Sequence, residues 1–300
     1  MVNPEQQRLV DQYEMLRSSV QQTSRRECIR QLDPSLFVEH FSYLEERDAD
    51  VVKRLNAVYN KALEFIPEGS RHFDVASWNG SFVVDHLLKK ASHVVGIDFE
   101  EWHNLLAEYY AHSNQVEDRV QFLQMTAQDI KKNATLLGGM ESFDSATAVG
   151  FFNEGYEGSP GDEILILESI YSMLKPGGTF ISTIADTDLR CFYPNAARFY
   201  NSGYEFPPDE YGYMLQQIYG EKNVLTYGQI FLSDGNIGTT FPMKIQRVPL
   251  ENGGCRYVPR PIDLTYELEP METPGRQSGK LPPDRYFPMF RMYVAQKPLR

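Results

Sequence analysis

The chain has 300 residues, of which 42% are hydrophobic and 23% charged, a composition typical of a globular protein large enough to bury a core. Its net charge of -12 argues against nucleic acid as a partner, because such binding depends on Lys and Arg neutralising phosphates. The N-terminus lacks the apolar stretch of a signal peptide, and the sequence contains no apolar run of about 18 residues. We therefore expect a cytoplasmic protein that makes no membrane contact.

The first segment, residues 1–67, predicts helices. Pro4 follows a capping asparagine, as is typical of a helix start. Apolar residues then recur at steps of three and four, at Leu9, Tyr13, Leu16 and Val20. Asp33 and Pro34 begin a second stretch of this kind. We expect an N-terminal helical cap that either packs on the core as a layer or forms a lid over an active site.

From His72 onward, short apolar runs alternate with helical patterns. The expected strands are residues 72–77, 92–98, 120–127, 142–152 and 179–186. This alternation predicts right-handed crossovers and a mostly parallel sheet with helices on both faces. We therefore expect an α/β, Rossmann-like core over residues 68–186, with a ligand crevice at the carboxyl ends of its strands.

The pattern becomes irregular after Asp186. Residues 187–285 are rich in aromatic residues, Pro and Gly. Their pattern predicts a helix at 209–219 and strands in TFPMKIQRV and IDLTYEL. We expect this part to be a β-rich insertion that binds substrate or forms a lid. The segment FRMYVAQKP predicts a final core strand within residues 286–300.

The sharpest motif is FDVASWNGSF at residues 73–82. Asp74 lies at the end of the first expected strand. A turn of small and polar residues follows, made of Ala76, Ser77, Asn79 and Gly80. Turns of this kind bring backbone N–H groups close to a bound nucleotide. Asp98 ends the second strand 18 residues after Gly80, close to the spacing expected of an acid that holds ribose hydroxyls.

These motifs resemble the core of class I methyltransferases that use S-adenosylmethionine (SAM), over residues 71–186. The family's acid–apolar–Gly–x–Gly–x–Gly motif keeps only its last glycine here, and Trp78-Asn79-Gly80 is similar to a Trp-Asp/Asn-Gly version found in a subset of the family. Phe143-Asp144 and the Leu-Lys-Pro-Gly-Gly segment at 174–178 also match family patterns. The resemblance implies a SAM cofactor on a Rossmann-like sheet.

The resemblance also assigns residues to the cofactor. It implies that Asp98 chelates the ribose, that Phe99 lies against the adenine, and that Asp129 and Ile130 meet the adenine amino group and ring. The expected first-turn contacts are Asp74, Ala76, Ser77 and Gly80. Asp129 has an alternative role as a turn cap, and Trp78 as a packing anchor. NAD suits the turn less well, because Trp78 occupies a position where a dinucleotide needs glycine.

Methyl transfer requires orientation and desolvation of the acceptor, and a base only when the nucleophile arrives protonated. All six histidines precede residue 113, so none follows the fourth or fifth strand. Glu154, after the fourth strand, is the candidate acid/base. Candidate substrate contacts are Asn153, Tyr193, Tyr200, Tyr204 and Tyr211, of which the tyrosines could instead pack the insertion against the sheet.

The sequence thus predicts a SAM-dependent methyltransferase that acts on a small molecule, with O-, N- and C-methylation all open. The altered glycines and the lack of a clear base leave a second interpretation, a catalytically inactive protein of the same fold that serves as a partner-binding or regulatory subunit. A methyltransferase of protein or RNA, a SAM-binding cyclase and an oxidoreductase are further alternatives. We expect no metal and no nucleic acid, and leave a homodimer open.

Overall fold

The computed structural model describes residues 4–19, 25–32, 58–154, 162–185, 208–231, 237–249, 255–261 and 288–299. The chain divides into two compact units, Met1–Asn133 and Ala134–Arg300. Among the helices of the described ranges, none is both long and apolar enough to cross a membrane. The four segments predicted from the sequence, with boundaries at 67, 186 and 285, stay a prediction.

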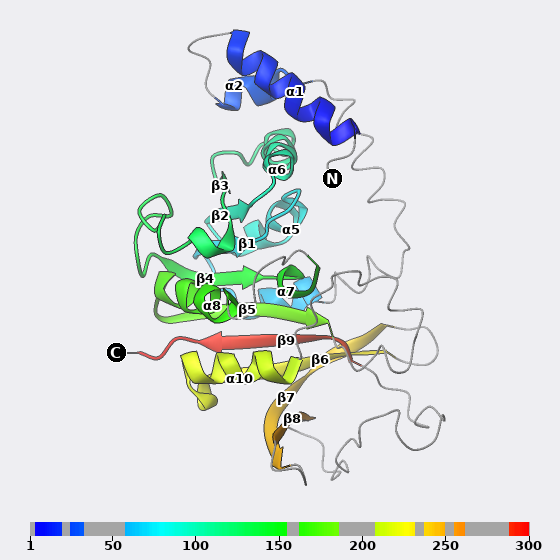
Figure 1. Cartoon of the computed structure of the whole chain (residues 1–300), viewed down its shortest axis with the longest axis vertical. Coiled ribbons are helices and arrows are strands. Elements are labelled where there is room, and N and C mark those ends of the chain that lie inside the picture. Colours follow the sequence, from blue (N-terminus) through cyan, green and yellow to red (C-terminus); the bar gives the residue numbers. More distant parts are fainter. Residues whose placement is uncertain are drawn as a thin grey trace. The chain divides into compact units, whose positions relative to one another are not determined.

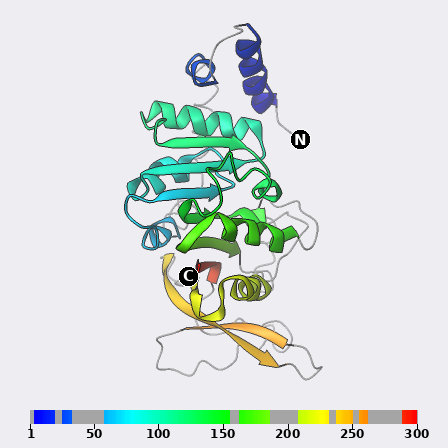
Figure 2. The same ribbon diagram turned by 90° about the vertical axis from the view of Figure 1, so that its left-hand side faces the viewer.

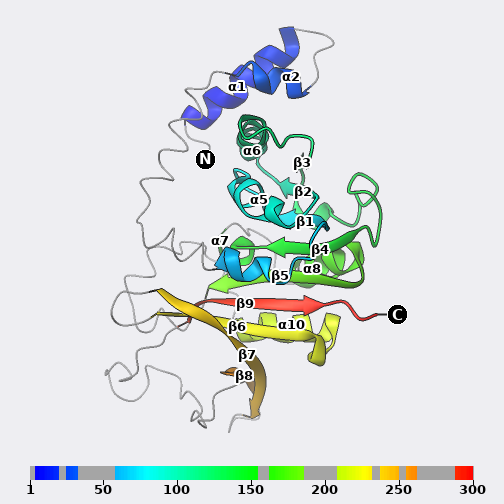
Figure 3. The same ribbon diagram turned by 180° about the vertical axis from the view of Figure 1, so that it is seen from behind.

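The first unit is built on three parallel strands. They are β1 (Arg71–Val75), β2 (His93–Asp98) and β3 (Val120–Gln124), with β2 in the middle. The helices between them are α5 (Ser81–Asp85), η1 (Leu87–Lys89) and α6 (Glu101–Ser113), and α5 lies beside α6 (Figures 1 and 3). Nearly every residue of β1 and β2 is buried, as expected for parallel strands covered on both faces. The first three expected strands are confirmed.

The helical segment that follows β1 is not continuous. Helix α5 ends at Asp85 and the 3-10 turn η1 begins at Leu87, because His86 adopts a φ of -125° that is incompatible with a helix. The ring of His86 packs against Tyr59, with ring centroids 4.9 Å apart, and against Phe82. The segment between β1 and β2 is therefore divided between an α-helix and a 3-10 turn.

Two N-terminal helices, α1 (Pro4–Ser19) and α2 (Arg25–Arg30), pack on α6 (Figures 1 and 2). Their shared apolar cluster consists of Tyr13, Cys28, Ile29, Leu32, Trp102, Leu105 and Leu106. Burial of these side chains supports the packed-layer interpretation for both helices. The second helical stretch expected from Asp33 lies outside the described residues.

The second unit carries the remaining strands, in the order β4-β5-β9-β6-β7-β8. Their bounds are β4 (Phe143–Ala148), β5 (Leu174–Ala185), β6 (Val224–Phe231), β7 (Ile237–Pro249), β8 (Cys255–Pro261) and β9 (Pro288–Gln296). Its helices are α7 (Phe151–Glu154), α8 (Asp162–Met173), α10 (Pro208–Tyr219) and the 3-10 turn η4 (Glu221–Asn223). Strands β4 and β5 are parallel, and all later pairs are antiparallel (Figure 1). The chain's last strand, β9, lies between β5 and β6, so the expected final strand is confirmed.

Several strand bounds of this unit differ from expectation. Strand β4 ends at Ala148, and the chain then forms the short helix α7, so the strand expected over 142–152 was too long. Strands β6 and β8 were not predicted. Their sequences are weakly patterned, and pairing with β9 and β7 determines their conformation. The candidate strand IDLTYEL lies outside the described residues.

The Leu-Lys-Pro-Gly-Gly segment is a structural bulge at the start of β5. Phe143 pairs with Leu174 and Ser145 pairs with Thr179. A step of two residues along β4 therefore corresponds to a step of five residues along β5. Gly177 has a φ of +79°, which glycine adopts without steric cost. Lys175 Nζ donates to Asp144 Oδ1 at 2.6 Å and fixes the bulge to β4.

Candidate cofactor site

The turn after β1 has an unusual backbone. Ala76, Trp78 and Gly80 have φ values of 61°, 47° and 76°, so alternate residues are left-handed. For Ala76 and Trp78 this conformation is costly, because the Cβ atom crowds the backbone. Backbone strain of this kind clusters at ligand sites, where the surrounding structure enforces it. The turn identified in the sequence is therefore also conformationally distinctive.

Four backbone N–H groups of this turn are bonded within the protein. The pairs are Ser77 N to Ile97 O at 2.9 Å, Trp78 N to Asp98 Oδ2 at 3.1 Å, Gly80 N to Ser77 O at 2.9 Å and Ser81 N to Asn79 Oδ1 at 3.1 Å. Dinucleotide turns bind a pyrophosphate through N–H groups that point at the ligand. Because these four donors already have acceptors, the turn suits a ligand without phosphate.

Asp98, at the end of β2, joins the turn to helix α6. Its Oδ2 accepts the Trp78 N–H, and its Oδ1 accepts the Glu100 N–H at 3.0 Å and the ring Nδ1 of His103 at 2.8 Å. A carboxylate only accepts, so His103 carries its proton on Nδ1. The Asp98 side chain is 5% exposed. Asp98 is the predicted ribose acceptor, and its hydrogen bonds also hold the turn against the start of α6.

The backbone around Asp98 connects the ends of β2 and β3. Asp98 O accepts the Met125 N–H at 2.9 Å and the Asn104 side-chain amide at 3.1 Å. Gln124 Nε2 donates to Phe99 O at 3.3 Å. The end of β2, which carries the predicted ribose and adenine contacts Asp98 and Phe99, is thus hydrogen-bonded to the end of β3.

Aromatic rings lie close to Asp98 and His103. Phe99 is 53% exposed, so it offers an apolar face next to Asp98. The ring of His103 lies 3.9 Å from that of Trp102 and meets Trp78 edge-on, with centroids 6.2 Å apart. The Trp78 contact supports its alternative role as a packing anchor.

Two buried polar atoms of the turn lack partners among the described residues. They are Ser77 Oγ and Asn79 Nδ2, on side chains that are 4% and 1% exposed. A Cβ added at Gly96 would lie 2.8 Å from Ser77 Oγ, so the Ser77 side chain packs on β2 under the turn. The Ser77 hydroxyl is therefore held against β2, and Asn79 Nδ2 is a donor without an acceptor among the described residues.

The other predicted cofactor residues differ in exposure. Asp129, in the 3-10 turn η2 (Ala127–Asp129), accepts the Thr126 hydroxyl at 3.0 Å, and its side chain is 43% exposed. The Asp129 carboxylate is therefore hydrogen-bonded within its turn and still faces solvent. Ile130 is fully buried, and Asp74 is 2% exposed within β1. The contact of Ile130 with adenine stays a prediction that requires a local opening.

The structure also reveals a residue that sequence reasoning missed. His103 lies in the first turn of α6 and binds Asp98, five residues earlier. The available signal was a histidine at the start of the helix that follows the strand-ending acid. A side chain there can turn back toward the strand end.

The predicted substrate residues belong to the second unit. The backbone of Asn153 and Glu154 ends helix α7, whereas their side chains, and all of Tyr193, Tyr200 and Tyr204, lie outside what the structure describes. Tyr211 is fully buried, and its hydroxyl donates to Ser182 Oγ at 2.8 Å. Burial raises the pKa of Tyr211 well above its ordinary value. Tyr211 is therefore a core residue, and its burial supports the packing alternative over a substrate contact for this tyrosine.

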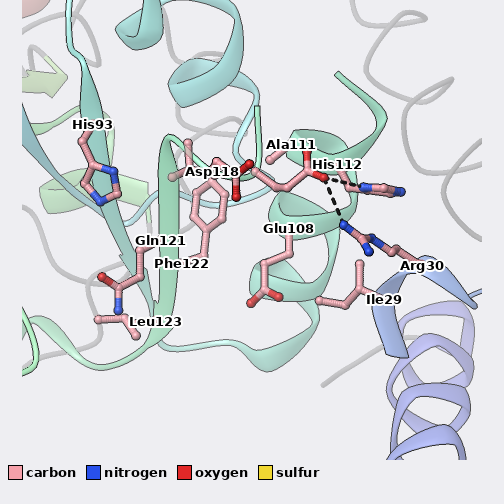
Figure 4. A pocket seen from close by; sticks show the side chains of 12 residues that line it. Ile29, Arg30, His93, Glu108, Ala111, His112, Asp118, Gln121, Phe122 and Leu123 are labelled. Carbon is pink, nitrogen blue, oxygen red and sulfur yellow. Dashed lines mark hydrogen bonds and ion pairs between the residues drawn. The ribbon is translucent and has the colours of Figure 1, made fainter. Parts of the chain in front are cut away.

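A hollow of about 410 Å³ lies elsewhere in the first unit, along β3, α6 and α2 (Figure 4). Glu117 Oε1 accepts His112 Nδ1 at 3.1 Å and Arg30 Nη2 at 3.4 Å there. Two hydrogen bonds lower the pKa of Glu117. The larger effect comes from its own backbone N–H, and the next largest comes from His112. Turn residues 74–80 do not line this hollow. Among the described residues, no group of three His, Cys, Asp or Glu side chains is arranged to hold a metal ion.

Solved structures include proteins with this fold. A SAM-dependent methyltransferase from Thermotoga maritima is 17% identical over 87% of this chain and 98% of its own, with a TM-score of 0.50. One from Methanosarcina mazei is 14% identical over 79% and 96%, with a TM-score of 0.47. The match to the cyclase SpnF spans 42% of this chain and 43% of the cyclase, at 21% identity and a TM-score of 0.36. No protein-family model matches the sequence, and no curated protein matches it.

The fold class predicted from the sequence is confirmed. The chain has the Rossmann-like α/β fold seen in SAM-dependent methyltransferases, a mixed sheet with a parallel core and flanking helices. At these identities the likeness establishes the fold and leaves the activity to the site.

Proposed function

We propose that the turn at residues 74–80 binds SAM and that the protein is a methyltransferase of a small-molecule acceptor. The observation that carries the proposal is a turn in which four N–H groups are already bonded within the protein, with a carboxylate, Asp98, beside it. SAM has no phosphate and offers ribose hydroxyls, which are donors. The turn and Asp98 match that pattern and do not match a pyrophosphate.

The described residues carry the hydrogen-bond acceptors and the exposed aromatic ring that an adenosyl group requires. Asp98 would accept from the ribose, the exposed ring of Phe99 would lie on the adenine, and Asp129 would accept from the adenine amino group. Asn79 Nδ2, which has no hydrogen-bond partner among the described residues, would add a further donor at the turn. Bound SAM supplies an electrophilic methyl group on its sulfonium. The chain's own part is to orient the acceptor and to exclude water from it.

The acceptor site belongs to the same proposal. We infer that Glu154 acts as acid or base and that Asn153, Tyr193, Tyr200 and Tyr204 contact the acceptor. Apolar pockets with a few polar groups are typical of small-molecule sites. The net charge of -12 supports a small acceptor over nucleic acid.

One observation favours a second candidate function. The Asp98 side chain is only 5% exposed and already has three donors, so Asp98 would have the same role in a protein of this fold that binds no cofactor. Such a protein would act as a partner-binding or regulatory subunit. Cofactor binding distinguishes the two functions.

Calorimetric titration tests the proposal. S-adenosylhomocysteine (SAH) should bind the whole chain with a measurable affinity, and NAD should not. Absence of heat with both SAM and SAH at about 1 mM, where a detectable complex needs only about -4 kcal/mol, would favour the subunit function.

Asp98→Asn should weaken SAH binding by about 10- to 150-fold, since a hydrogen bond to a charged group contributes about 1.5–3 kcal/mol. Asp85→Asn is the matched control, because Asp85 is an exposed carboxylate of the same unit that lies outside the turn and accepts hydrogen bonds from the Tyr110 hydroxyl. Its affinity for SAH should equal that of the unmodified protein. Equal affinities for all three proteins would remove Asp98 from the site.

A further inference from the structure

We infer that Asp98 can accept only one ribose hydroxyl, and that His103 is the positioning residue that sets this limit. The inference rests on the proposed function and concerns how the same site distinguishes adenosyl ligands. It predicts that the site recognises one of the two ribose hydroxyls through a charged acceptor and tolerates loss of the other.

The limit follows from the number of acceptor positions on a carboxylate. Two oxygens offer about four lone-pair positions in all. The two positions on Oδ1 receive the Glu100 N–H at 3.0 Å and His103 Nδ1 at 2.8 Å. On Oδ2, the Trp78 N–H takes one position at 3.1 Å. A single position on Oδ2 is left for a ligand.

The two donors on Oδ1 are held in place. Glu100 precedes the first residue of α6, and its carbonyl accepts the Asn104 side-chain amide at 2.8 Å, so its backbone is fixed to the helix. The His103 ring contacts both Trp78 and Trp102, and its side chain is 15% exposed. A ribose that approached Oδ1 would have to displace a charge-assisted hydrogen bond, which is among the stronger kinds in proteins.

The two ribose hydroxyls therefore become inequivalent. One donates to a buried carboxylate, and the other must find water or a neutral group. Removing the hydroxyl that donates to Asp98 loses a charge-assisted hydrogen bond and weakens binding. Removing the other hydroxyl changes the binding free energy little. The ligand class that this site accepts thus includes adenosyl thioethers that lack one particular hydroxyl.

The experiment compares SAH with its 2′-deoxy and 3′-deoxy analogues by calorimetry on the whole chain. We expect one analogue to bind about 10-fold or more weakly than SAH and the other to stay within about threefold. Equal losses for both analogues would mean that both hydroxyls reach Asp98, and no loss for either would mean that neither does. Both outcomes overturn the inference but leave SAH binding intact. Failure of SAH itself to bind overturns the proposed function together with this inference.

Two variants test the role of His103. His103→Ala should free a position on Oδ1, so the tolerated analogue should then bind more weakly than SAH. His103→Asn keeps a side-chain N–H donor near the Nδ1 position and should restore the original ratio. A purely structural role would change the melting temperature and all three affinities together, without changing their ratio. An unchanged ratio in His103→Ala would overturn the role of His103, and the analogue series on the unmodified protein tests the single-hydroxyl limit even if that variant does not fold.

Discussion

Gly80→Ala is expected to destabilise the protein by roughly 2–5 kcal/mol, combining about 1–2 kcal/mol for a left-handed alanine with about 1–3 kcal/mol for overpacking. Gly80 has a φ of +76°. An added Cβ would lie 2.8 Å from the Cβ and 2.9 Å from the Cα of Ala107, and 3.1 Å from Phe122. The Ala107 contact involves the backbone of α6, which cannot move alone. Urea unfolding measures the loss.

Gly69→Ala provides the control for this substitution. Gly69 has a similar φ of +71°, but a Cβ there would meet no atom within 4 Å. Gly69→Ala should lower the free energy of unfolding only by the cost of a left-handed alanine, about 1–2 kcal/mol. The difference between the two variants isolates the close approach of the turn to α6, and equal losses in both would contradict that close approach.

Acidification is expected to destabilise the first unit through His72, a fully buried residue of β1. Burial lowers the pKa of His72 from 6.5 to about 3. Below pH 6.5, His72 therefore binds a proton in the unfolded chain but stays neutral in the folded chain. The free energy of unfolding thus decreases as the pH drops from 6.5 toward 3. Between pH 7 and pH 5 the loss amounts to about 2 kcal/mol for this one group.

Unfolding curves at a series of pH values measure this effect. His72→Gln removes the titrating group, so its stability should change by about 2 kcal/mol less over that range than the stability of the unmodified protein. His93→Gln is the neighbouring control on β2, because His93 is partly exposed and burial lowers its pKa less. Parallel pH curves for His72→Gln and the unmodified protein would show that His72 is not buried in its neutral form.

The sequence was sufficient to predict the elements with a strong repeating pattern. Strands β1 to β5 are apolar runs bounded by turn residues, and most of them are separated by helices, so their succession along the chain was predictable. The break at His86 was not, because it depends on where the Tyr59 and Phe82 rings pack. Strand β6 likewise depends on a partner, β9, whose paired residues lie 58 to 71 positions later in the chain, from Ile230↔Pro288 to Val224↔Ala295.

The candidate site was predictable as a set of positions and not as a geometry. The acid at the end of β2 and the turn after β1 follow from spacing alone. The engagement of Asp98 by Trp78 and His103 depends on the fold of the turn against α6. For the same reason the sequence could not show that the Ser77 side chain packs on Gly96 beneath the turn.

A crystal structure with SAH bound tests most directly whether the 74–80 turn holds an adenosyl group. We expect one ribose hydroxyl within hydrogen-bonding distance of Asp98 Oδ2, the adenine along Phe99, and the Asp98–His103 contact unchanged. Electron density for SAH away from this turn, or a turn closed by protein side chains in the presence of saturating SAH, would contradict the account.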